Sequence, residues 1–235
     1  MVRCMAVVQM QTGSVIGGGS TLSRSAPVSS LRTSTHVWSA DVQGNIIIWD
    51  PLRMAAAREV AVARGEAIFS LCQVGRSVWI GTSGQIFSVD LQTFAMFNWR
   101  GHERPINDLI YHDGLVWTAS NDGTIKVWEG GSTPQDVHLV KEFNVLPGSI
   151  LFALANGKHL ICGGHTDGAI LAWNPQNAGE VARFGEQESG VRSLLWVEGN
   201  TAHHLDDTGE PSRRLALWAG SRDGTIHVWQ LEGSE

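Results

Sequence analysis

The sequence predicts an all-β protein that is assembled from repeated four-stranded units. Short runs rich in Val, Ile and Trp recur at intervals of about 40 residues, and Asp-Gly pairs stand between several of them. These runs are shorter than the helices of about ten residues or more that periodicity could indicate, and their β-branched and aromatic content favours strands. Four such runs per period are typical of a repeat that contributes one four-stranded sheet.

The third strand of each unit shows the repeat most clearly. Four runs end on Trp49, Trp128, Trp173 and Trp229, and a fifth run, 85–89, carries valine in the tryptophan position. The ends of these five runs lie 40, 39, 45 and 56 residues apart. Five matching runs at this spacing predict five units.

Further series of strands and turns keep step with the third strand. Asp-Gly pairs begin at Asp122, Asp167 and Asp223, where glycine accepts the positive φ of a tight hairpin turn. First strands are expected at 28–31, 68–71, 106–109, 151–154 and 191–194, and second strands at 37–39, 78–80, 116–118, 160–162 and 217–219. Outer strands are expected at 138–143 and 180–184.

Together these motifs resemble the WD-repeat β-propeller family. In the third unit a Gly-His pair at 101–102, an Asp-Gly pair at 122–123 and Trp128 stand at the family's spacing, with Glu129 in the place of the family's aspartate. The resemblance implies a structural tetrad of hydrogen-bonded side chains that locks this blade: His102, Thr118, Asp122 and Trp128. The other units hold Arg24, Arg64, Pro147 and Gln187 at the histidine position, so a complete tetrad is expected in one blade only.

The repeats cover nearly the whole chain as one domain, 1–235. Blades are expected at about 27–65, 66–100, 101–146, 147–186 and 187–235, with 1–20 as closing or leftover strands. Residues near Val7 to Ile16 are expected to supply the outer strand that the last blade lacks, because this closure hides two sheet edges. Two ring sizes stay open, a closed five-bladed ring and a part of a six- or seven-bladed ring.

Composition narrows the classes of partner and compartment. The chain carries 23 acidic and 17 basic side chains for a net charge of −6, which argues against binding nucleic acid through its phosphates. The sequence contains no uninterrupted apolar window of 18 residues, so no membrane span is expected. Three distant cysteines, Cys4, Cys72 and Cys162, predict neither a disulfide framework nor a zinc site. A reducing, cytoplasmic location is therefore expected.

Catalytic and metal-binding motifs are not evident in the sequence. It lacks a GxSxG elbow, a Walker loop and an HExxH helix, so no enzyme activity, cofactor or small-molecule substrate is expected. The insertion at 198–213 contains His203, His204, Asp206 and Asp207, which are residue types that coordinate metals. Its polar composition favours a solvated loop without a metal. The ten tryptophans are expected to pack in the core and between blades.

Function is therefore expected to lie on the surface. The family resemblance implies that partners dock on the loops before the first strands and on the Asp-Gly hairpins, here Arg104, Asn121, His165, Thr166, Arg192 and Arg222. Three arginines suggest an acidic or phosphorylated peptide, because guanidinium groups pair with carboxylate and phosphate. A non-catalytic scaffold that binds other proteins is the leading hypothesis. The alternative is a regulatory propeller of a larger enzyme, because the Val-Trp and Leu-Trp strand openings are similar to those of inositol polyphosphate 5-phosphatase propellers.

Overall fold

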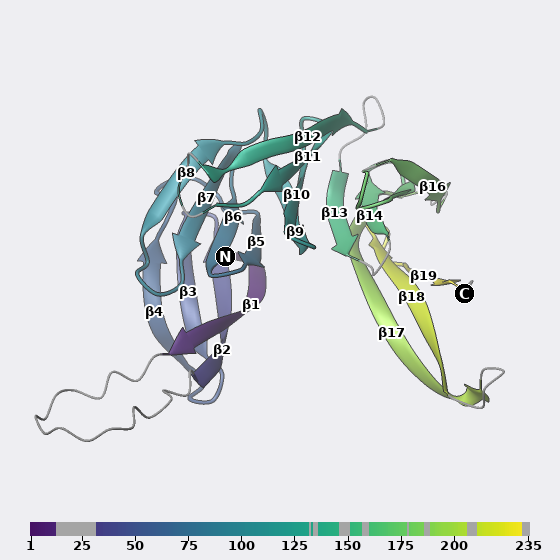
Figure 1. The fold of residues 1–235 in the computed structure, drawn as a ribbon, viewed down its shortest axis with the longest axis horizontal. Helices are drawn as coiled ribbons and strands as arrows, with labels where there is room; N and C mark the ends of the chain where they lie inside the picture. Colours follow the sequence, from purple (N-terminus) through teal and green to yellow (C-terminus); the bar gives the residue numbers. More distant parts are fainter. Residues whose placement is uncertain are drawn as a thin grey trace, which may run out of the picture.

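A computed structural model describes residues 1–12, 32–131, 133, 136–145, 151–156, 160–177, 179–185, 189–205 and 211–231. Within these residues the chain forms nineteen strands in five antiparallel sheets, which confirms the all-β propeller fold. The sheets follow one another along an open arc, with the first and the last sheet at its two ends (Figure 1).

Strands pair in chain order within every sheet. The first sheet contains β1 (Val2–Thr12), β2 (Arg32–Asp41), β3 (Asn45–Asp50) and β4 (Ala55–Ala61), and the second contains β5 (Ser70–Val74), β6 (Ser77–Gly81), β7 (Gln85–Asp90) and β8 (Met96–Arg100). The third contains β9 (Ile106–His112), β10 (Leu115–Ser120), β11 (Thr124–Glu129) and β12 (His138–Asn144), and the fourth β13 (Leu151–Asn156), β14 (Ile161–His165), β15 (Ile170–Trp173) and β16 (Glu180–Phe184). The fifth, described as three strands, contains β17 (Val191–Leu205), β18 (Pro211–Ser221) and β19 (Ile226–Leu231).

The N-terminal strand differs from its predicted role. β1 pairs along its length with β2, in a register that sets Val7 opposite Val37, and so takes the first-strand position of the first sheet. The expectation that this segment completes the last blade is therefore wrong. The first strand predicted at 28–31 lies outside the described residues. The side chains of Cys4, Ala6, Val8 and Met10 pack in the core shared with the second sheet, and this burial fixes the register of β1.

The insertion in the last unit also differs from its prediction. β17 and β18 continue through much of it as one long antiparallel hairpin, in which Leu205 pairs with Pro211. The predicted solvated loop is therefore wrong for the described backbone. His203 and His204 lie in β17, whereas Asp206 and Asp207 lie outside the described residues.

Tryptophans alternate between the two faces of the sheets. We call the face that packs on the next sheet in the chain the forward face, and the opposite one the rear face. Forward faces carry the second-strand tryptophans, of which Trp38, Trp79 and Trp117 are fully buried. The predicted packing role is wrong at the two ends of the arc, where Trp49 on the first sheet is 36% exposed and Trp218 on the fifth sheet is 42% exposed.

The turn between β3 and β4 contains a strained residue that allows a test of backbone energetics. Asp50 Oδ1 accepts hydrogen bonds from the amides of Leu52 and Arg53, and the exposed Met54 that follows has φ of 51°. A left-handed conformation costs a side chain with a Cβ about 1 kcal/mol or more. We expect Met54→Gly to raise the free energy of urea unfolding by about 0.5 kcal/mol after the entropy cost of glycine. Leu52→Gly is the control, and a gain there too would contradict the assignment to φ.

Candidate functional site

The four predicted tetrad residues lie in one hydrogen-bonded series in the third sheet. His102 Nδ1 lies 3.0 Å from Asp122 Oδ2, and its Nε2 lies 2.7 Å from Thr118 Oγ1. Trp128 Nε1 donates to the same hydroxyl at 3.0 Å. The series joins the loop before β9 to β10, to the Asp-Gly turn and to β11. His102 is buried, so these hydrogen bonds are shielded from water and hold the strands together.

The carboxylate of Asp122 is held by more donors than the sequence indicates. Thr124 donates its hydroxyl at 2.7 Å and its amide at 3.0 Å, and the amide of Glu103 donates at 3.0 Å. Burial alone would raise the pKa of Asp122, but the hydrogen bonds from His102 and Thr124 outweigh it and hold this pKa well below its usual range. Thr124 is thus a fifth member of the hydrogen-bonded series. Its position directly after the Asp-Gly pair is the only indication of this role in the sequence.

Equivalent positions in other sheets keep parts of the tetrad. Trp49 Nε1 donates to Ser39 Oγ at 2.8 Å, which matches the contact of Trp128 with Thr118. Asp167 and Asp223 accept hydrogen bonds from amides two residues ahead, as turn residues do. Of the four substitutes at the histidine position, Arg64 is exposed, and Arg24, Pro147 and Gln187 lie outside the described residues.

The predicted arginines are all exposed, but they belong to two separate sheets. Arg104 precedes β9 in the third sheet, and its carbonyl accepts a hydrogen bond from Ser120. The amide of Arg222 donates to Gly190 at 2.9 Å, which places the turn of the fifth sheet beside the start of β17 and Arg192. The structure therefore brings Arg192 and Arg222 to the same end of one sheet, with the fourth sheet between them and Arg104.

The three remaining residues of the predicted partner face are less accessible. His165 is fully buried in β14, and burial lowers its pKa to about 4, so its assignment to a binding surface is wrong. Asn121 is half-buried and accepts a hydrogen bond from the Asn107 side chain at 2.6 Å. Thr166 is half-buried in the turn after His165. All five residues of β14 are buried, so strand alternation could not show that His165 is inaccessible.

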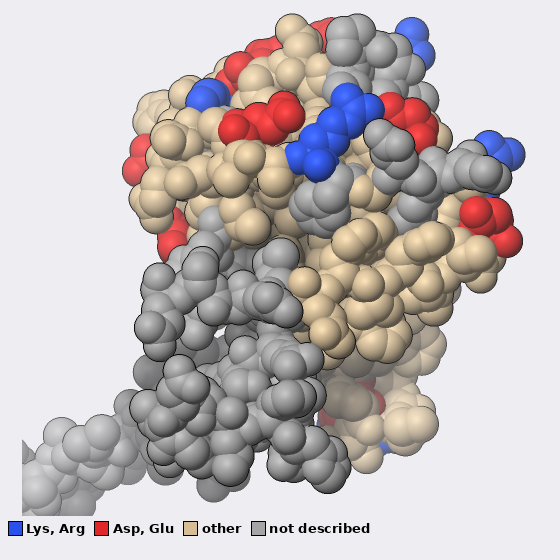
Figure 2. Space-filling view, turned by 90° about the vertical axis from the view of Figure 1, so that its right-hand side faces the viewer, with Lys and Arg blue, Asp and Glu red and all other residues tan. Residues whose placement is uncertain are grey.

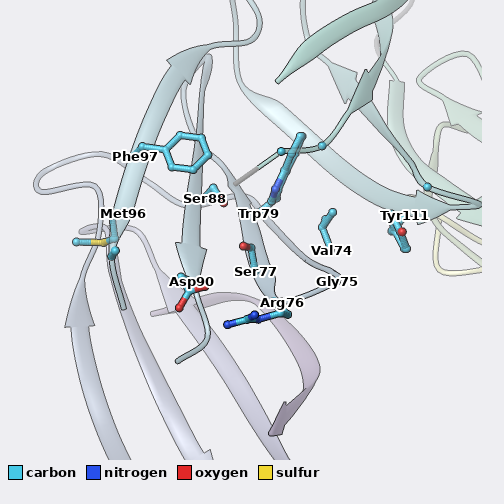
Figure 3. A pocket seen from close by; sticks show the side chains of 14 residues that line it. Val74, Gly75, Arg76, Ser77, Trp79, Ser88, Asp90, Met96, Phe97 and Tyr111 are labelled. Atoms are coloured by element: carbon cyan, nitrogen blue, oxygen red, sulfur yellow. The ribbon is translucent and has the colours of Figure 1, made fainter. Parts of the chain in front are cut away.

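A pocket of about 480 Å³ lies between the second and third sheets, and its residues were not predicted as a site. Val74 to Ser77, Trp79, Met96 and Phe97 form its wall on the second sheet, and Tyr111 stands on the opposite side (Figure 3). The bare backbone of Gly130 and Gly131 completes the wall from the third sheet. A Cβ on Gly130 would lie 3.3 Å from the Trp79 ring, so glycine at this position leaves room beside the indole.

Aromatic rings give the pocket a rigid wall and charged groups give it a polar rim. Trp99 packs edge to face with Trp79 at 4.8 Å and stacks on Phe97 at 5.6 Å. Arg76 donates to the Gln92 side chain at 2.5 Å and extends toward Asp90 (Figure 3). Hydrogen bonds from Thr93 and Gln92 lower the pKa of Asp90, so the rim carries both charges. An apolar wall with a few fixed polar groups is the usual construction of a binding site.

A second unpredicted feature is the carboxyl group of Asp108 in β9. It accepts hydrogen bonds from the amides of Leu154 in the fourth sheet at 2.8 Å and of Leu109 at 2.9 Å. Burial raises the pKa of Asp108 to about 7 despite these bonds. Burial also raises the pKa of the Cys4 and Cys72 thiols to about 12, with the charge of Asp108 adding to the effect. The two thiols are therefore poor nucleophiles.

Clusters of metal-binding side chains and membrane-spanning helices are absent from the described part of the chain. No group of three or more His, Cys, Asp or Glu side chains there is arranged to hold a metal ion. Among the same residues, no helix has the length and apolar character to cross a membrane.

Curated relatives share part of the chain. It is 28% identical over 157 residues to a probable serine/threonine-protein kinase, pats1, of Dictyostelium discoideum, in a match that covers 66% of this chain and 5% of that protein. It is 27% identical over 179 residues to a WD repeat-containing protein 55 homolog of the same organism, covering 59% of this chain and 40% of the relative. The chain thus spans well under two thirds of these relatives.

A solved structure and a family model give the same fold. The β-propeller domain of Cps50 (Swd1) from Myceliophteria thermophila superposes with a TM-score of 0.61 at 16% identity, covering 82% of this chain and 61% of that one. The family model described as the IP5P C-F β-propeller matches residues 10–128, just over half of the chain. The WD-type repeat, the propeller sheets and this match agree, and the chain belongs to the IP5P C-F β-propeller family.

Proposed function

We propose that this propeller is a non-catalytic scaffold that binds other proteins and assembles them into complexes. The WD-repeat relative and the propeller fold support a role in protein interaction, but a fold of this kind hosts many functions. The proposal is therefore carried by one observation, the aromatic pocket between the second and third sheets.

The shape and lining of the pocket fit an extended segment of a partner protein. One apolar side chain would lie against Met96 and Phe97, with Tyr111 closing the opposite side. Arg76 and Asp90 at the rim supply one charge of each sign for polar groups that flank this side chain. Buried aromatic residues at the centre of an interface typically contribute most of its binding energy.

A substitution at Tyr111 tests this pocket. Peptides are first selected on the wild-type protein from a random display library. We expect Tyr111→Arg to weaken binding of the selected peptides at least tenfold in fluorescence polarisation, because arginine both fills and charges the apolar side of the pocket. Leu139→Arg is the control, since Leu139 is 45% exposed against 39% for Tyr111 and does not line the pocket. Equal affinities of the two variants would show that the selected peptides do not bind in the pocket.

The exposed arginines support a finer proposal, that the scaffold also binds acidic or phosphorylated peptides at the Asp-Gly turns. Arg192 and Arg222 lie at one end of the fifth sheet, and Arg104 lies at the same end of the third. Guanidinium groups form charge-assisted, often bidentate hydrogen bonds with carboxylate and phosphate. Nucleic acid and small-molecule substrates are not part of this proposal.

Charge-reversal variants distinguish binding at these arginines from an effect of the net charge of the protein. We expect Arg104→Glu combined with Arg222→Glu to reduce binding of a phosphoserine peptide library at least tenfold, with the melting temperature unchanged. A double variant with Arg53→Glu and Lys141→Glu changes the net charge equally at exposed positions away from these turns. If both double variants lose binding to the same extent, the effect belongs to net charge and the proposed site is wrong.

A second candidate function is that of a regulatory propeller in a larger enzyme, an inositol polyphosphate 5-phosphatase. The match of residues 10–128 to the IP5P C-F propeller family favours it. Sequencing the transcript tests it, because an open reading frame that continues into a phosphatase domain is required. We also propose a cytoplasmic location, which the free thiols of Cys4, Cys72 and Cys162 support and a fluorescent fusion would test.

A further inference from the structure

The second-strand tryptophan begins the same row of side chains on the forward face of each of the first three sheets. Residues that stand directly opposite one another in neighbouring strands point to the same face of a sheet. Across the second, third and outer strands these rows are Trp38, Ile48 and Arg58 in the first sheet, Trp79, Ser88 and Phe97 in the second, and Trp117, Val127 and Lys141 in the third. Because the rows occupy the same place in the repeat, the group that covers one row indicates what the same place can hold at another.

The second sheet covers the row of the first sheet with a phenylalanine. Phe94, in the turn between β7 and β8, stacks on Trp38 with the ring centroids 6.4 Å apart, and the guanidinium of Arg58 lies over the Phe94 ring, 3.8 Å from its centroid. Leu91, directly after β7, is buried in the same core. Phe94 has φ of 58°, a conformation that is strained for a bulky side chain. The contacts of this ring therefore offset a backbone cost.

The corresponding turn of the third sheet covers the row of the second sheet with bare backbone. Two residues after the tryptophan position of the third strand stand Leu91 in the second sheet, Gly130 in the third and Pro175 in the fourth. Leu91 and Pro175 are buried, whereas Gly130 contributes no side chain. The pocket of about 480 Å³ opens at this place, because its lining includes Gly130 and the whole row of the second sheet (Figure 3). It is the counterpart of the space that Phe94 fills one sheet earlier.

We propose that a partner protein fills this pocket with an aromatic side chain, which takes the place that Phe94 has between the first and second sheets. The inference rests on the proposed function and specifies its partner, because the segment that binds then presents a phenylalanine, tyrosine or tryptophan. Phe97, which is half-buried, and Tyr111, which is 39% exposed, are the rings that this side chain meets. Aromatic pairs contribute more to binding than the apolar area that they bury, so an aromatic ring is favoured over an aliphatic side chain.

Matched substitutions in the peptide test the chemistry of the occupant. Peptides selected on the wild-type protein are retained when the Tyr111→Arg variant binds them more weakly in fluorescence polarisation. This filter is needed because apolar surface is exposed elsewhere, at Leu195 and Trp218 and over the broad uncharged area of described surface in Figure 2. We expect each retained peptide to contain one aromatic residue whose replacement by leucine weakens binding about fivefold, and whose replacement by another aromatic residue weakens it about twofold or less.

Substitution of Phe97 tests the same equivalence from the side of the protein. Phe97→Arg gives the second sheet the residue that the first sheet has at this position, Arg58. With an aromatic occupant the new guanidinium lies over its ring, as Arg58 lies over Phe94, so we expect the retained peptides to bind at least as tightly as to the wild type. Phe97→Ala is the matched control and should weaken binding about fivefold, because it removes the wall and supplies no cation. Should Phe97→Arg fail to fold by circular dichroism, Phe97→Lys replaces it and copies Lys141 of the third sheet.

The outcomes separate this inference from the proposed function. If no selected peptide loses binding in the Tyr111→Arg variant, the pocket is not the binding site and both proposals are wrong. If the retained peptides accept leucine without loss, the pocket binds a partner but the aromatic occupant is wrong. The same conclusion follows if Phe97→Arg weakens binding as much as Phe97→Ala, because an aliphatic occupant needs the apolar wall and gains nothing from a cation.

Discussion

A His102→Leu variant is expected to unfold with a free energy about 3 kcal/mol lower than that of the wild type. Leucine has nearly the volume of histidine but offers no partner to Thr118 or Asp122, and both of these groups sit in a largely buried network. Removing one member of such a network leaves the others with unsatisfied polar atoms, which costs about 1–3 kcal/mol for each group. Urea unfolding followed by tryptophan fluorescence measures the difference. His138→Leu, on the exposed strand β12, should change stability by less than about 0.5 kcal/mol.

The acid limb of the stability profile gives the same network a second readout. Because the pKa of Asp122 is lowered in the folded protein, its carboxylate contributes stability that is fully present above the unfolded pKa of about 4 and is lost as the pH falls below it. The His102→Leu variant lacks the strongest of the hydrogen bonds that lower this pKa. Its stability should therefore fall less steeply with acid between about pH 4 and pH 2. An unchanged slope would show that His102 does not control the carboxylate.

Asp108→Asn is expected to invert the order of stability between acid and alkaline pH. The pKa of Asp108 is raised from 3.8 to about 7, so the folded state favours the neutral acid. The stability that the neutral carboxyl group of Asp108 provides is therefore fully present below about pH 4 and is lost as the pH rises through about 7. A pKa shift of this size corresponds to a loss of about 4 kcal/mol in the free energy of unfolding. Asparagine stays neutral throughout and avoids that loss.

Thermal unfolding at pH 4.5 and pH 8.5 tests the inversion. The variant should melt below the wild type at pH 4.5, because the amide offers one acceptor oxygen where the acid accepts from both Leu154 and Leu109. It should melt above the wild type at pH 8.5. Glu59→Gln, an exposed change on β4, should leave the pH profile unchanged. Parallel profiles for Asp108→Asn and the wild type would contradict the burial of this carboxyl group.

Local patterns predicted the parts of the fold that depend on neighbouring residues in sequence. The series ending at Trp49, Trp128, Trp173 and Trp229 marked the third strands, and the Asp-Gly pairs marked their hairpins. Gly123 has φ of 82°, as the predicted turn requires. Turn chemistry and strand alternation act over a few residues, so one sequence is sufficient to recognise them.

Long-range pairing was predicted less well. The first-strand position of the first sheet was assigned to 28–31. The strand found there is β1, which ends at Thr12, far from its partner β2 in the sequence. The insertion at 198–213 was polar enough to predict a loop, yet cross-strand hydrogen bonding carries much of it as a hairpin. For β1 the possible partners are distant in the chain, and local composition does not rank them. In the insertion the paired residues are close in sequence, but its polar composition suits an exposed hairpin as well as a loop.

Sequence by itself determined the repeat, the all-β class and the turns, because each follows from residue type and short spacing. The four tetrad residues were identified through the resemblance to the WD-repeat family. Only the tertiary structure decided the environments: the pocket beside Trp79, the half-buried Asp108 with its raised pKa and the burial of His165. It also separated the buried tryptophans from Trp49 and Trp218, which occupy the same strand positions in sequence. Burial depends on whether another sheet lies against the face, and that is a property of the assembled arc and not of the repeat.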